Sequence, residues 1–131
     1  MSGIFTILQL EYGKNTKQLA LVLRPGQVSD TGFAVQVVHL LMGNHPEADR
    51  LLNHEIKPGT VLEQMGAKNF LTVCSFSESP SDLVEFGKLL NRFAPMGMKV
   101  VLGGGGIESW RLAEPQSGSV YGVAIAMVKN K

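Results

Sequence analysis

The chain contains a single cysteine, Cys74, which cannot form an internal disulfide or a CxxC metal or redox motif. The first residues, Met1–Phe5, lack the basic region and the long apolar core of a signal peptide. The most apolar window, Phe33–Met42, is about half as long as a membrane span. These absences predict a soluble cytoplasmic protein that does not associate with membranes.

An excess of basic charge is also lacking. Twelve Lys and Arg stand against eleven Asp and Glu, which leaves a net charge of +1. Proteins that bind nucleic acid usually carry a basic excess or patch, so we expect no nucleic-acid partner. Charged residues make up only 18% of the 131 residues. A chain of this length is expected to form one globular domain over residues 1–131. Because it has few charges, we also expect it to cover part of its apolar surface by forming a homo-oligomer, a dimer or larger.

The sequence also lacks the short motifs that identify common catalytic and cofactor sites. It contains neither the GxGxxG nor the GxxxxGKS/T pattern of nucleotide sites, and neither the HExxH pattern of zinc enzymes nor the GxSxG pattern of serine hydrolases. Sequence reasoning therefore assigns no reaction, no cofactor and no metal site, and it leaves open whether the protein is an enzyme.

Strand and helix patterns are present throughout the N-terminal half. Residues 3–12 and 17–24 are rich in apolar and β-branched types and flank a turn, which predicts an N-terminal hairpin. A helix is expected over residues 31–42. The pair Asn44 and Glu47 has capping-box spacing and predicts the start of a second helix.

The C-terminal half predicts a βαβ unit and a second hairpin. A strand at 69–76, a helix and a strand at 98–102 form the unit, whose strands we expect to be parallel neighbours. Strands at 107–112 and 119–128 form the C-terminal hairpin. The fold class is α/β, with α+β as the alternative: a mixed sheet of five or six strands with two or three helices.

The helix at 31–42 is apolar nearly all round, with Gln36 and His39 as its only polar residues after the first turn. Asp30 and its two neighbours are candidate N-caps, and Gly43 is placed to end the helix. Such a helix predicts burial on more than one side, in the core or under a partner subunit, so we expect His39 to be a core or interface residue. Strand 119–128 is apolar on both faces and predicts a central strand or an interface in the same way.

A glycine run is the clearest local feature of the sequence. Gly103, Gly104, Gly105 and Gly106 directly follow the strand at 98–102. Backbone N–H groups of glycines at the carboxyl end of a parallel strand can approach an anion such as phosphate or carboxylate. The alternative is a connection that needs positive φ.

Polar residues near the two strand ends extend this candidate site. Ser77 and Ser79 follow the strand at 69–76 and precede a helix, where they either contact an anion or cap the helix. Trp110 and Arg111 follow the glycine run and predict either ligand stacking and anion binding or cross-strand packing. We expect the carboxyl ends of both strands to meet at one edge of the sheet.

The densest polar cluster comprises His45, Glu47, Asp49, Arg50, His54 and Glu55. His45 and Asp49 have a spacing that can hold a metal, but His54 would lie on the opposite side of a helix from His45. We interpret the cluster as a solvated helix face. Cys74 is expected to be a buried small apolar residue.

Two hypotheses of function follow. The first is a small-molecule-binding domain for an anionic ligand at the edge near Gly103–Gly106. The alternative is a non-catalytic, self-associating module that uses helix 31–42 and strand 119–128 as its interface.

Overall fold

The chain is described by a computed structural model over residues 7–12, 16–24, 26–52, 62, 64–75, 81–103, 111–112 and 121–130. Its strands are β1 (Ile7–Tyr12), β2 (Thr16–Leu23), β3 (Phe70–Ser75), β4 (Met98–Gly103), β5 (Arg111–Leu112) and β6 (Tyr121–Lys129). Its helices are the 3-10 turn η1 (Gln27–Ser29), α1 (Thr31–Leu41), α2 (Ala48–Leu51) and α4 (Ser81–Phe93). The predicted mixed α/β class is confirmed.

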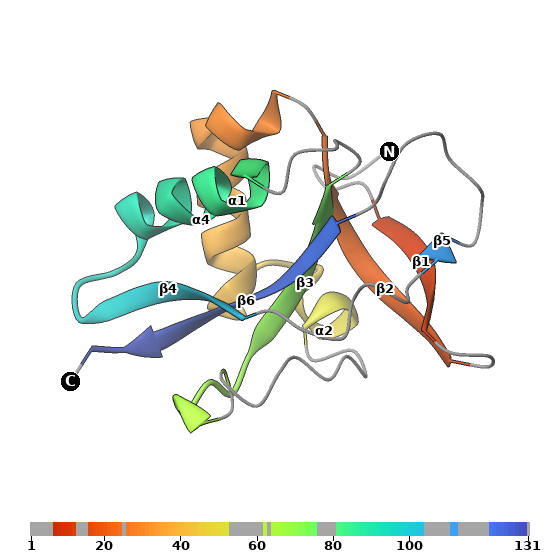
Figure 1. Ribbon diagram of the computed structural model, residues 1–131. Coiled ribbons are helices and arrows are strands. Elements are labelled where there is room, and N and C mark those ends of the chain that lie inside the picture. The colour runs from red at the N-terminus through yellow and green to blue at the C-terminus, as the bar shows by residue number, and fades with distance from the viewer. Residues whose placement is uncertain are drawn as a thin grey trace.

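The described strands form a mixed sheet in the order β4-β6-β3-β2-β1-β5 (Figure 1). β1 and β2 are antiparallel, and β2 and β3 are parallel neighbours joined through α1 and α2. β6 is antiparallel to both β3 and β4. The two-sided apolar pattern of β6 therefore reflects a place inside the sheet, with Ala124 and Ala126 buried on one face and Ile125 and Met127 on the other.

Two sequence predictions about strand pairing are wrong. β3 and β4 run in the same direction, as a βαβ unit requires, but β6 lies between them, so they are not neighbours. β5 pairs with β1 instead of β6, so the predicted C-terminal hairpin does not form between the described strands. The physical reason is that an apolar strand such as β6 loses more water-exposed surface between two strands than in an edge hairpin.

Both ends of α1 follow the predicted capping chemistry. The Asp30 side chain accepts a hydrogen bond from the Phe33 N–H at 3.0 Å, so Asp30 is the N-cap. Gly43 has φ 81° and follows the last turn. Its N–H bonds to the Leu40 carbonyl and the Asn44 N–H bonds to the His39 carbonyl, which is the pattern of a Schellman motif.

The start of α2 differs from the prediction. Its N-cap is Glu47, which makes no side-chain capping bond, so the predicted capping box with Asn44 is wrong. The Glu47 N–H instead donates to Nδ1 of His45 at 3.1 Å. α2 ends at Leu51 and its continuation toward Ile56 lies outside the described residues.

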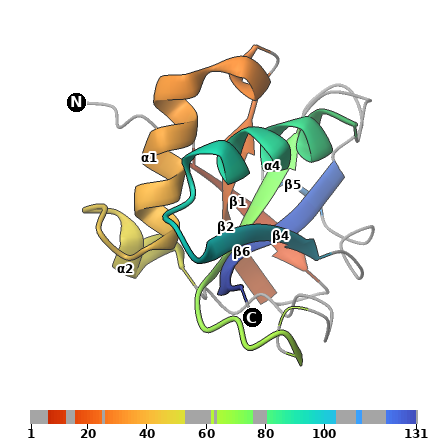
Figure 2. The ribbon, with the colours of Figure 1, turned by 90° about the vertical axis from the view of Figure 1, so that its left-hand side faces the viewer.

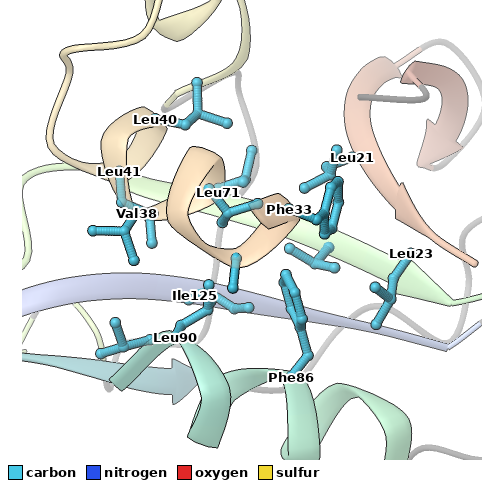
Figure 3. Packing of buried hydrophobic residues seen from close by; sticks show 14 of the residues in the cluster. Leu21, Leu23, Phe33, Val38, Leu40, Leu41, Leu71, Phe86, Leu90 and Ile125 are labelled. Carbon is cyan, nitrogen blue, oxygen red and sulfur yellow. The ribbon is translucent and has the colours of Figure 1, made fainter. Parts of the chain in front are cut away.

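One face of the sheet is covered by α1 and α4, which cross one another (Figures 1 and 2). Phe33 of α1 and Phe86 of α4 place their ring centroids 5.4 Å apart, above Leu23 and Ile125 of the sheet (Figure 3). Leu83, Phe86 and Leu90 are buried at the helical spacing that the sequence predicted for α4. This layer contains most of the hydrophobic core.

The other face of the sheet has a smaller apolar cluster. Leu62 is fully buried and packs over Ala124 and Ala126 of β6, beside Phe70 and Val101. The small residues of β6 allow a single leucine to lie close to the sheet backbone. The segment that includes Leu62 and Ala67 therefore forms part of a second, thinner layer.

None of the helices among the described residues is long and apolar enough to cross a membrane.

Candidate functional site

Of the eight residues of the predicted anion site, the structure describes Gly103 and Arg111. The others lie outside the described residues, namely Ser77, Ser79, Gly104, Gly105, Gly106 and Trp110. Gly103 ends β4 and Arg111 begins β5, which are the first and last strands in the sheet order. Five strand spacings of the sheet separate these strands, about 24 Å. The structure therefore does not bring Gly103 and Arg111 together.

Gly103 has a packing role in the described structure. A Cβ atom on this residue would lie 2.7 Å from Cγ of Leu62, which is too close for a stable contact. Leu62 is fully buried in its cluster, so a Cβ at position 103 would require Leu62 or the end of β4 to shift. The first glycine of the run is therefore required by Leu62, a reason that involves no ligand.

The start of β4 and the end of β6 lie at the opposite edge of the sheet (Figure 1). A cavity of about 660 Å³ lies there. One wall is the end of α1, and another is the segment 65–69 that leads into β3. The first residue of β4 and residues 127–130 of β6 and its end complete the lining. The volume is within the range of small-molecule sites in proteins. We call this cavity the methionine–lysine pocket.

Four methionines give the pocket its apolar surface: Met42, Met65, Met98 and Met127. Met42 and Met65 are each 42% exposed, whereas Met127 is buried at 7%. Methionine side chains are flexible and polarisable, so they adapt to apolar groups of different shape. The pocket is therefore suited to an apolar chain or ring.

Two lysines, Lys68 and Lys129, give the same pocket a positive charge. Both side chains are exposed, and no Asp or Glu is among the described residues of the lining. Within the part of the chain that the structure describes, the ion pairs join Arg50 to Glu47 and Lys88 to Glu85, so neither pocket lysine is neutralised by an acidic partner. The uncompensated charge favours an anionic group at the pocket.

The histidines and Cys74 do not form a site in the described structure. His39 is exposed on α1, so it is not a core residue of the single chain, and its place in a subunit interface stays a prediction. His45 accepts the Glu47 N–H, and Arg50 pairs with Glu47 at 3.3 Å on the surface. His54, Glu55 and the side chain of Cys74 lie outside the described residues. Among residues that are described, no three His, Cys, Asp or Glu side chains are placed to hold a metal.

Comparison of the chain with models of protein families, with curated proteins and with solved structures found no significant match. The support for a functional site therefore comes from the geometry and chemistry of the described residues.

Sequence reasoning did not identify the residues of the methionine–lysine pocket. They come from four separate segments, and each segment alone has the composition of a strand or helix end. The local signal was the presence of Met or Lys at these ends: Met42 after α1, Lys68 before β3, Met98 at the start of β4 and Lys129 at the end of β6. Only the strand order brings these ends to one edge.

Proposed function

We propose that the protein binds a small amphipathic anion, such as an alkyl carboxylate, in the methionine–lysine pocket. The observation that supports this is the combination, among the described residues that line one cavity, of four methionines and two lysines without an acidic residue. This retains the anionic small-molecule ligand expected from the sequence and moves its site to the opposite edge of the sheet.

The two parts of such a ligand would gain free energy in different ways. Its apolar part would be transferred from water to the methionine surface, at about 25 cal/mol per Å² of apolar area buried. Its anionic group would stay at the rim, near the exposed ammonium groups of Lys68 and Lys129, and keep part of its hydration. Exposed charge pairs contribute roughly 0.2–1 kcal/mol each, so the apolar part supplies affinity and the lysines select the charge.

Matched ligands test this proposal by isothermal titration calorimetry. Decanoate, decanol and decylammonium have the same carbon chain and a negative, neutral or positive head group. We expect decanoate to bind most tightly and its advantage to shrink as ionic strength rises, because salt screens exposed charges. Equal affinity for all three ligands, or no binding, would contradict the proposal.

A pair of charge variants locates the site. Lys129→Gln removes one pocket charge, and Lys88→Gln removes an exposed charge on α4 that is outside the pocket lining and pairs with Glu85. We expect the first variant to bind decanoate roughly two- to five-fold more weakly and the second to bind as the parent does. Equal effects of the two substitutions would show that net charge, and no particular pocket, attracts the ligand.

Self-association is the second candidate function, but its expected interface needs revision. Six residues of α1 are buried against the core, and β6 is covered on both faces, so these apolar elements are satisfied within one chain. A groove of about 400 Å³ between η1 and α4 has a different pattern: Asp82 and Glu85 precede Lys88 and Arg92 along one wall. An antiparallel copy of α4 would set acidic residues of one chain opposite basic residues of the other.

Charge reversal tests this interface. Light scattering at micromolar concentration should show a dimer, Glu85→Lys should weaken it, and Glu85→Lys combined with Lys88→Glu should restore it. A monomer at these concentrations would contradict self-association without affecting the small-molecule proposal.

A further inference from the structure

A second cavity, of about 560 Å³, adjoins the methionine–lysine pocket. The residues that line both cavities are Met65, Val128, Lys129 and Asn130. The second cavity adds Gln64 and Lys99 and, like the first, has no Asp or Glu among the lining residues that the structure describes. We call these two adjoining cavities, which meet at the end of β6, the trough.

The strand order places the two outer lysines on either side of β6. Lys99 of β4 lies opposite Val128 of β6. Lys68 precedes β3, which is the neighbour of β6 on its other side. β3 and β4 are two strand spacings apart, about 10 Å, and Lys68 lies two residues before the start of β3, so Lys68 and Lys99 lie on either side of β6.

The trough concentrates positive charge in a nearly neutral protein. The net charge of the chain is +1, yet three exposed lysines line the trough, and none of its described lining residues is acidic. In the described part of the chain, Lys99, like the other two, takes part in no ion pair. Ammonium groups kept close together repel one another, and a bound anion at each end of the trough would relieve that repulsion.

We infer that the ligand of this site is a linear dianion, with one anionic group near Lys68 and Lys129 and a second near Lys99. This inference rests on the proposed function and adds the substrate class. The chain between the two anionic groups lies over Met65 and Val128, the apolar residues common to both cavities. Lys99 is then the residue that distinguishes a dianion from a monoanion.

Decanedioate and decanoate test the inference, because they have the same number of carbons and differ only in the second carboxylate. Isothermal titration calorimetry at low ionic strength should show decanedioate binding roughly two- to five-fold more tightly to the parent protein. Lys99→Gln should remove this preference, because it should weaken the binding of decanedioate more than the binding of decanoate. Lys88 is an exposed lysine of α4 outside both cavities, so Lys88→Gln should change the affinity for neither decanoate nor decanedioate.

The outcomes separate the inference from the proposed function. If decanoate binds and decanedioate binds equally or more weakly, the second anionic subsite is absent and the amphipathic monoanion remains the ligand. If Lys99→Gln keeps the preference for the dianion, the second carboxylate does not contact Lys99 and the inference is wrong. If neither compound binds, both the inference and the proposed function are wrong.

Discussion

The side chain of Asn91 and the backbone of Val100 form two reciprocal hydrogen bonds. Nδ2 of Asn91 donates to the Val100 carbonyl at 3.0 Å, and the Val100 N–H donates to Oδ1 of Asn91 at 2.6 Å. Val100 lies in β4, which is the first strand in the sheet order. The amide of Asn91 therefore occupies backbone groups on the outer side of an edge strand, where another chain would otherwise pair.

Replacing Asn91 should lower the free energy of unfolding. Asn91→Ala removes both bonds and leaves the Val100 groups to water, so we expect a loss of about 1–3 kcal/mol in urea unfolding. Asn91→Asp keeps an acceptor for the N–H but sets a carboxylate oxygen against the carbonyl, and it should also destabilise. Lys88→Ala, an exposed position on the same helix, is the control. A loss no larger than that of the control would show that the pair contributes nothing to stability.

Two buried glycines should respond differently to alanine. A Cβ on Gly103 would meet Cγ of fully buried Leu62 at 2.7 Å, and we expect Gly103→Ala to cost about 1–3 kcal/mol. A Cβ on Gly87 would meet a terminal methyl of half-buried Leu102 at 2.9 Å. That methyl can move, and alanine gains about 1 kcal/mol of helix propensity, so Gly87→Ala should be close to neutral.

A double-mutant cycle checks the contact behind the Gly103 prediction. Leu62→Ala removes the colliding side chain, so Gly103→Ala should cost clearly less in that background than in the parent. Thermal unfolding of the four proteins measures the coupling. Additive effects would mean that Leu62 is not what requires a glycine at this position.

Thr72 offers a test of polar burial. It is 1% exposed, and its hydroxyl oxygen has no hydrogen-bond partner within the described structure. Thr72→Val removes the hydroxyl at nearly constant shape, so we expect the free energy of unfolding to rise by about 1 kcal/mol. The reciprocal change at the next position, Val73→Thr, adds a hydroxyl to a fully buried site and should destabilise. A loss of stability in Thr72→Val would reveal a partner for this oxygen.

The contribution of the α1 N-cap, Asp30, to stability can be distinguished from that of its neighbour Ser29. Asp30→Ala removes the bond to the Phe33 N–H and should cost about 0.5–2 kcal/mol. Ser29→Ala removes only a long contact of 3.5 Å to the Gly26 carbonyl and should change stability by less than about 0.5 kcal/mol. Circular dichroism during thermal unfolding measures both. Equal losses would contradict the assignment of Asp30 as the cap.

Local features of the fold were predictable from the sequence because neighbouring residues determine them. The cap at Asp30, the end of α1 at Gly43 and the buried face of α4 each depend on contacts within a few turns of chain. The two-sided apolar pattern of β6 also predicted its burial correctly. In each case one segment contains the whole signal.

Long-range arrangement was less predictable. Whether β6 pairs with β5 or lies between β3 and β4 depends on which arrangement buries more surface in the whole chain, and no local pattern in residues 119–128 decides it. The methionine–lysine pocket has the same origin, since Met42, Lys68, Met98 and Lys129 meet only through the strand order. The glycine run suggested a ligand site at Gly103, whereas the structure explains the glycine at this position by its close contact with Leu62.

The position of β6 also determines when the sheet can be completed during synthesis. It is the last described strand in chain order, yet β4 pairs with it alone among the described strands. β3 and β4 leave the ribosome before the strand that joins them, so β4 waits without a partner strand until residues 121–129 appear. A chain that stops before residue 121 and a separate peptide carrying β6 would each lack what the other supplies, which is the arrangement that split-protein reporters use.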